Sequence, residues 1–208
     1  MVRRSVLAMF AVIAIVLGFV VISTPAGAVV DTAVIVPSPN AGTSDDRLFS
    51  VSCVSASDCV AVGSTYTGSV NKTLTMVWNG TVWVVVTSPS PGTSDDYLYS
   101  VSCVSASECV AVGITKTGSA YETLVMVWNG SVWSIVTSPS PGTSDRLFSV
   151  SCVSASECVA VGYTNTGNAD QTLVISLTGP EPAPTTTTTV APSPTTVAPD
   201  QVVPVFTG

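Results

Sequence analysis

Six cysteines form the most regular pattern of reactive side chains in the sequence. They fall in three pairs, each with five residues between its members: Cys53 and Cys59, Cys103 and Cys109, and Cys152 and Cys158. In an oxidising compartment, an even number of cysteines in this repeated spacing predicts one disulfide within each pair. A thiolate metal site would need closer pairs that converge in space, and pairs separated by a repeat are not expected to converge. The cysteines are therefore expected to be covalent staples, and the sequence implies no cofactor.

Two pairs of tryptophans could bind a ligand. Trp78 and Trp83 bracket one Asn-Gly dipeptide, and Trp128 and Trp133 bracket another. Exposed indole rings beside a hairpin turn would form a platform on which a sugar can stack, so these four are candidate ligand-binding residues. The alternative is that at least one ring of each pair packs between neighbouring units, because large apolar rings are mostly buried in folded chains.

Carboxylates cluster in two equivalent loops and offer the oxygen ligands that calcium prefers. Asp45 and Asp46 follow Gly-Thr-Ser in one loop, and Asp95 and Asp96 follow it in the next, whereas a third copy has only Asp145. These are weak calcium candidates. The alternative is a turn in which the aspartate bonds its own backbone.

The same carboxylates could serve a hydrolase acting on glycans, with Asp46 and Asp96 as acid and base. Near-identical repeats argue against this reaction, because acid and base need environments that separate their pKa values. The chain also has no histidine and only 9% charged residues, so it lacks the side chains that enzymes usually recruit for proton transfer. The sequence favours a protein that is not an enzyme.

An internal repeat positions all of these residues. The segment from Leu48 to Gly63 recurs at 98–113 and at 147–162, with spacings of 50 and 49 residues. Apolar and polar residues alternate over short runs, which indicates half-buried strands and not helices. The strands expected in the first unit are 48–54, 59–64, 73–78 and 82–87. The Asn-Gly dipeptides predict tight hairpin turns between the third and fourth strands.

The repeat does not begin and end at unit boundaries. The segment 32–36 lies fifty residues before the fourth strand of the first unit, and the third copy stops after its third strand. Three units at about 48–87, 98–137 and 147–177 are therefore expected, with a strand at 32–36 completing the third. A strand borrowed from the other terminus closes ring-shaped repeat proteins and hides an exposed edge.

The motif Ser-Val-Ser-Cys-Val-Ser-Ala-Ser-Glu-Cys-Val-Ala-Val-Gly, followed by Met-Val-Trp-Asn-Gly-Ser-Val-Trp, resembles the blade repeat of secreted actinobacterial β-propeller-like repeat proteins. The resemblance covers Val34 to Leu177 and implies an all-β fold of four-stranded blades. Propellers need four to eight blades, and this chain has three. Two chains joined as a six-bladed ring, a three-fold β-trefoil-like fold and a shortened gene product all fit the count, and the strand order favours blades over a trefoil.

The two ends of the chain differ from the repeats. Residues 1–28 combine Arg3 and Arg4, an apolar run and a final Ala-Gly-Ala, which predicts a secretory signal peptide cleaved after Ala28. The alternative is an uncleaved anchor helix. Residues 29–179 form the three-repeat β domain, and residues 180–208 are rich in Thr and Pro, which indicates a disordered linker.

Together these features predict an extracellular protein, either secreted or associated with the cell wall. Loss of the signal would leave 4 basic and 13 acidic residues, a net charge of −9, so nucleic acid is not an expected partner. A membrane is expected to be contacted only through the signal before cleavage. The expected role is a binding or scaffold protein of unknown ligand, with a glycan-acting hydrolase or carbohydrate-binding module as the alternative. A homodimer, a glycan and a surface protein are left open as partners.

Overall fold

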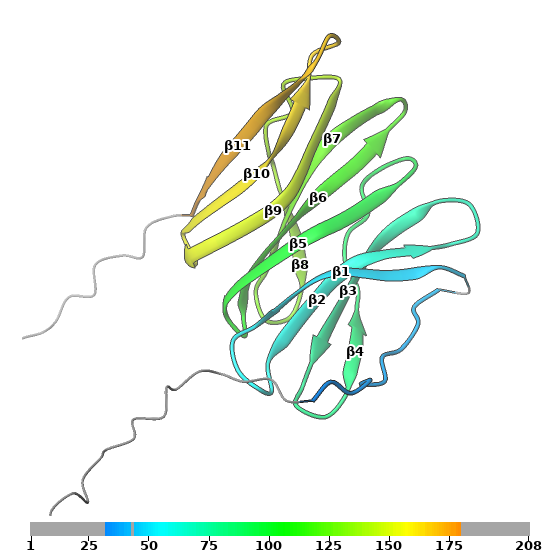
Figure 1. Cartoon of the computed structure of the whole chain (residues 1–208), viewed down its shortest axis with the longest axis vertical. Helices are drawn as coiled ribbons and strands as arrows, with labels where there is room; N and C mark the ends of the chain where they lie inside the picture. The colour runs from blue at the N-terminus through cyan, green and yellow to red at the C-terminus, as the bar shows by residue number, and fades with distance from the viewer. Residues whose placement is uncertain (1–31, 43, 180–208) are drawn as a thin grey trace, which may run out of the picture. The chain divides into compact units, whose positions relative to one another are not determined.

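The computed structural model of the protein describes residues 32–42 and 44–179. The predicted signal peptide (1–28) and the Thr/Pro-rich linker (180–208) lie outside these ranges. The described part of the chain is all-β, as predicted, and contains strands but no helix (Figure 1). No helix in these ranges is therefore long and apolar enough to cross a membrane.

The strands form three successive antiparallel units, each a simple meander. The first unit is β1 (Asp46–Cys53), β2 (Cys59–Tyr66), β3 (Asn71–Trp78) and β4 (Trp83–Val86). The second unit is β5 (Asp96–Ser105), β6 (Glu108–Thr117), β7 (Ala120–Trp128) and β8 (Trp133–Val136). The third unit is β9 (Ser144–Ser154), β10 (Glu157–Asn165) and β11 (Asp170–Thr178).

The units belong to two open sheets. The first unit is a four-stranded sheet in the order β1-β2-β3-β4, and the second and third units share a seven-stranded sheet. They are joined there only by a parallel pairing of Tyr121 with Ser144, between β7 and β9. Neither sheet closes on itself, so the three units form an open stack.

The Asn-Gly dipeptides form turns, but the turns are longer than a two-residue hairpin. Trp78 pairs with Trp83, which leaves four residues between β3 and β4. The Asn79 side chain accepts hydrogen bonds from the backbone N–H groups of Thr81 and Val82, and Gly80 has φ of +87°. Only the glycine therefore uses the left-handed conformation, while the asparagine acts through its side chain.

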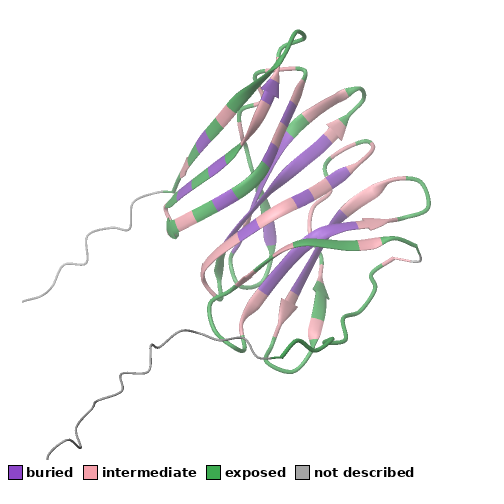
Figure 2. Ribbon diagram, in the orientation of Figure 1, coloured by how far each residue is buried: buried purple, intermediate pink, exposed green. Residues whose placement is uncertain are grey.

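Neighbouring units pack sheet against sheet. Each unit has a backward face, toward the preceding unit, and a forward face, toward the following unit. The two faces alternate along β6: Cys109 and Ala111 belong to the core shared with the first unit, whereas Val110 and Val112 belong to the core shared with the third. Figure 2 shows these buried stretches in the middle of the strands. Full burial of one such aliphatic side chain stabilises the fold by about 1.5–3 kcal/mol.

The strand predicted at 32–36 is not present. These residues carry no strand, and Val34 and Ile35 are exposed. The third unit consequently has three strands where the other two have four, and the predicted closure of the third unit by an N-terminal strand of the same chain is not observed.

Candidate binding groove between the second and third units

The structure forms all three predicted disulfides, Cys53–Cys59, Cys103–Cys109 and Cys152–Cys158. Each joins the first strand of a unit to the second, at directly paired positions of the two strands. The disulfides therefore mark the same end of each unit. The described residues contain no free cysteine and no cluster of three or more Cys, Asp or Glu residues suited to a metal.

The tryptophans divide between the core and the surface. Trp128 and Trp133 are only 7% and 5% exposed and belong to the core between the first and second units, so neither ring has a free face for a sugar. Trp78 and Trp83 are half-buried, with ring centroids 5.6 Å apart. Of the four candidate tryptophans, only Trp78 and Trp83 therefore have ring surface that a sugar could reach.

The loop carboxylates hold turns together. Asp46, Asp96 and Asp145 occupy equivalent positions, and each accepts a hydrogen bond from the backbone N–H of the glycine that opens its loop. Asp96 is fully buried, accepts a second bond from the Thr115 hydroxyl at 2.6 Å and lies 3.7 Å from Lys72 Nζ. A carboxylate held in this way has no free face for a substrate, which weighs against Asp96 as a catalytic acid or base.

The other two calcium candidates differ from one another. Asp95 accepts hydrogen bonds at 2.9 Å from both the backbone N–H and the side-chain amide of Asn71. These two donors lower the pKa of Asp95. Asp45 forms an exposed ion pair with Arg47 at 3.2 Å. Asp95 thus ties the first unit to the second, whereas Asp45 has no described partner in a neighbouring unit.

Two grooves lie between the units, at the end that carries the disulfides. One lies between the first and second units and has a volume of about 260 Å³. The other lies between the second and third units and has a volume of about 640 Å³. Their linings are related by the repeat: Cys59, Val77 and Trp128 in the first groove correspond to Cys109, Val127 and Leu177 in the second. The grooves are therefore two versions of one site.

The second groove is larger because the third unit lacks two parts that the other units have. Leu177 pairs with Cys158 in the way that Trp128 pairs with Cys109, so a leucine stands where the other units have a tryptophan. Within residues 44–179 the third unit also has no fourth strand to continue its sheet. The groove consequently extends along the forward face of the second unit to Val136 and Thr137.

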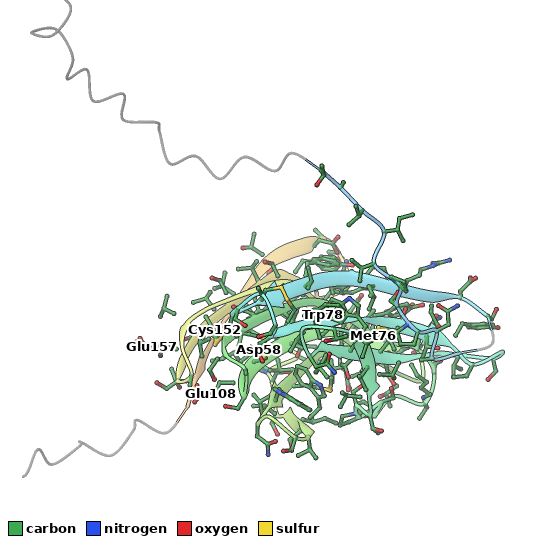
Figure 3. All side chains as sticks on the ribbon, turned by 90° about the horizontal axis from the view of Figure 1, so that it is seen from below. Asp58, Met76, Trp78, Glu108, Cys152 and Glu157 are labelled. Carbon is green, nitrogen blue, oxygen red and sulfur yellow. A yellow bond between two sulfur atoms is a disulfide. The ribbon has the colours of Figure 1, made fainter. Side chains whose placement is uncertain are left out.

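The groove is apolar inside and polar at its rim. Val110, Val125 and Ile175 form part of its floor, and Glu108 and Asn129 lie at its rim. Glu108 corresponds by the repeat to Asp58 and Glu157, and Figure 3 shows these three acidic side chains at the same side of the molecule as Cys152. An apolar floor with one carboxylate, Glu108, at its rim suits an apolar ligand better than an acidic one.

The outer edge of β11 borders this groove. In the first and second units the third strand pairs on its outer side with the fourth, from Trp78 with Trp83 to Thr75 with Val86. The corresponding positions on β11 are 174–177, which pair only with β10 in the described structure. The groove and the open edge together form a slot with the length and register of one short strand.

A row of aromatic side chains was missed by the sequence analysis. Phe49, Tyr99 and Phe148 lie at strand irregularities where the pairing of the first two strands of each unit skips a residue. Their rings line up across the three units with centroid distances of 5.7 and 5.5 Å. The signal in the sequence was an aromatic residue after the repeated leucine of every unit.

No protein-family model and no curated protein matches this chain. The fold and the groove therefore define the class at the level of architecture: an all-β protein of three repeated, disulfide-stapled units.

Proposed function

We propose that the protein is an exported binding or scaffold protein whose groove between the second and third units takes an extended apolar segment as an added strand. The observation that carries this proposal is the slot beside β11, which has an apolar floor and an unpaired strand edge. Addition of a strand to an open edge gives affinity through main-chain hydrogen bonds and specificity through alternate side chains.

The disulfides support the extracellular part of the proposal. Three disulfides are compatible with an oxidising compartment, and residues 1–28 have the composition of a secretory signal. We expect the protein to be recovered outside the cell with Val29 as its first residue. Amino-terminal sequencing checks this, and a cell-retained chain that still begins at Met1 would contradict it.

A peptide tests the groove directly. The probe is a labelled peptide copying residues 132–137, Val-Trp-Ser-Ile-Val-Thr, which include the fourth strand of the second unit. We expect saturable binding by fluorescence anisotropy. A peptide with proline at its second and fourth positions is the control, because proline cannot donate to a strand ladder.

A substitution in the groove locates the binding. Leu177→Trp restores the tryptophan that pairs with Trp133 in the second unit, so it is expected to strengthen binding of the peptide, whose second residue copies Trp133, by about two- to fivefold. Val153→Trp adds the same ring at an exposed position of the third unit and should leave binding unchanged. Absence of binding by the folded wild type, or equal binding by the Leu177→Trp variant, would refute the groove as the site.

The aromatic row supports a second candidate, a carbohydrate-binding module. Phe49 and Phe148 are exposed and Tyr99 lies between them, so the row offers ring surface to a sugar. A glycan array with the wild type and a Tyr99→Ala variant tests this role. Binding that is lost in the variant would support it, and an array without binding would dismiss it.

A further inference from the structure

The forward face of the third unit exposes residues that are buried in the other two units. Val159 and Val161 are 47% and 42% exposed. The corresponding residues of the second unit, Val110 and Val112, are 8% and 0% exposed because the third unit covers them. The forward face is thus buried in the first and second units and exposed in the third. An exposed apolar face of this kind marks an interaction surface.

The first unit is open at the other end of the stack. Leu48 and Val51 of β1 are 42% and 58% exposed, whereas their counterparts Leu98 and Val101 are 0% and 5% exposed against the forward face of the first unit. The middle of this backward face, including Met76, is buried. The free part of the face is therefore β1, the strand whose counterparts pack against the forward valines.

Hydrogen bonds from backbone N–H groups of one unit to serine hydroxyls of the preceding unit also join neighbouring units. Ser50 and Ser52 accept bonds from the backbone N–H groups of Val101 and Cys103. Ser100 and Ser102 do the same for the third unit. The next serines of the series, Ser149 and Ser151, are exposed and accept no such bond within the described chain. At the opposite end of the stack, Val51 and Cys53 correspond to the N–H donors Val101 and Cys103, and no unit precedes them in the described chain to supply the serine acceptors.

The segment before β1 has the composition of the strand that the third unit lacks. Residues 32–36 precede β1 as residues 82–86, which include β4, precede β5. Val34 and Ile35 are highly exposed and lie in no strand. A chain placed after the third unit, as the second unit is placed after the first, would bring this segment to the open edge of β11.

A threonine of the third strand binds the connection to the next unit in the first and second units, and the third unit has the threonine without such a partner in the described chain. The Thr73 hydroxyl bonds Ser88 and Ser90 in the segment that leads from β4 to β5, and Thr123 bonds the equivalent serines of the next connection. Thr172 is the third member of this series; its side chain is exposed, and its hydroxyl makes no hydrogen bond among the described residues. The equivalent partners before β1 are Ser38 and Asn40.

We infer that two copies of this chain join head to tail. The forward face and β11 edge of one third unit take strand β1 and the segment 32–36 of the other copy. This inference rests on the proposed function, since the donated segment is the extended apolar strand that the groove takes. Because the contact joins two different surfaces, it must close into a ring or continue as a filament. Two copies close with six units, within the four to eight blades of known propellers.

One pair of residues opposes the contact. Asp170 stands where the first unit has Asn71, the partner of Asp95. In the joined state Asp170 would therefore face Asp45, the counterpart of Asp95. Both are exposed, and each already has a partner, Asn165 for the first and Arg47 for the second. Added salt is consequently expected to strengthen the association, because it screens like charges.

Solution mass tests the inference. Light scattering on the purified, oxidised protein is expected to give the mass of two chains. Val51→Glu and Val161→Glu each place a charge in the contact and are expected to raise the dissociation constant at least about tenfold. Val132→Glu alters an equally exposed turn valine and should not. An equimolar mixture of the two contact variants should regain the mass of two chains through its one intact contact, because only a head-to-tail contact combines two different faces.

The donated strand has its own matched pair of variants. Ile35→Pro removes a backbone N–H from the donated segment 32–36 and is expected to weaken the dimer at least about tenfold. Ala41→Pro introduces the proline that the equivalent connections carry as Pro91 and Pro141, and should leave the dimer unchanged. Unfolding curves that match the wild type at low concentration show that each variant folds.

The outcomes separate this inference from the proposed function. A folded protein that stays monomeric at every attainable concentration but binds the 132–137 peptide overturns the self-association and leaves the groove as a strand-binding site. A dimer that persists equally in either single contact variant overturns the head-to-tail arrangement. A dimer lost in both variants and restored by mixing them supports it.

Discussion

Gly113 is the residue on which the packing of the first two strands of a unit depends most closely. A Cβ atom at this position would lie 1.8 Å from the carbonyl oxygen of Tyr97, in the partner strand beside the pairing irregularity at Leu98 and Ser100. Gly63 and Gly162 make the same close approach in their units. The glycine that ends the cysteine motif is thus required because the neighbouring backbone occupies the space of a side chain.

A methyl group at this position is expected to be costly. Gly113→Ala forces the backbone of β5 away from β6, and we expect a loss of about 1–3 kcal/mol or more in the free energy of unfolding. Urea denaturation followed by circular dichroism measures it. A change below about 0.5 kcal/mol would mean that the two strands separate more easily than their close approach implies.

Each disulfide stabilises the folded protein by closing a short loop of the chain. Each closes a sequence separation of six residues, for which the chain-entropy model gives about 2.4 kcal/mol. Replacing Cys103 and Cys109 together by serine is therefore expected to lower the free energy of unfolding by about 2 kcal/mol. The oxidised wild type, which keeps all three disulfides, is the reference, and a double variant as stable as this protein would contradict the estimate.

At the scale of elements, Asp95 links β3 of the first unit to the loop before β5 of the second. Because Asn71 donates two hydrogen bonds to this carboxylate, the pKa of Asp95 is lowered in the folded protein. A lowered carboxyl pKa stabilises the fold above the unfolded-state pKa of about 3.9 and stops doing so as the pH falls through the folded value.

The expected result is a stability difference that depends on pH. Asp95→Ala should be less stable than the wild type at neutral pH, and the difference should shrink as the pH falls below about 4. Asp45→Ala removes the counterpart that forms only an exposed ion pair and should change stability little at any pH. Chemical denaturation at several pH values measures both, and a pH-independent loss in Asp95→Ala would show that the effect is packing and not charge.

The strands could be predicted from the sequence because alternation and repetition act locally. Predicted strands at 48–54, 59–64, 73–78 and 82–87 became β1 to β4, with no end moved by more than two residues. The strand at 32–36 was wrong for the described chain, because a strand needs a paired edge that the sequence alone does not supply. The groove could not be predicted either, since it depends on two differences of the third unit together: Leu177 in place of a tryptophan, and no fourth strand among the described residues.

For the whole molecule, repetition makes the ends of the stack unlike its middle. The second unit is covered on both faces by its neighbours, whereas the third is covered on its backward face only and leaves Val159 and Val161 exposed. In a stack of repeats, stability is the sum of each unit and its contacts with its neighbours. In the part of the chain that the structure describes, the third unit therefore packs against one neighbouring unit fewer and has one strand fewer than the second.

This difference predicts uneven protection from hydrogen exchange. At low protein concentration, backbone amides of β11 should exchange faster than those of β7, the equivalent strand of the second unit, because fewer contacts oppose local opening. Head-to-tail association would cover β11, so its protection should rise with protein concentration while that of β7 stays constant. Mass spectrometry of peptides from the two strands across a dilution series measures this. Equal protection of both strands in the dilute protein would show that the units open together, and that the uncovered third unit depends on no contact beyond those within its own chain.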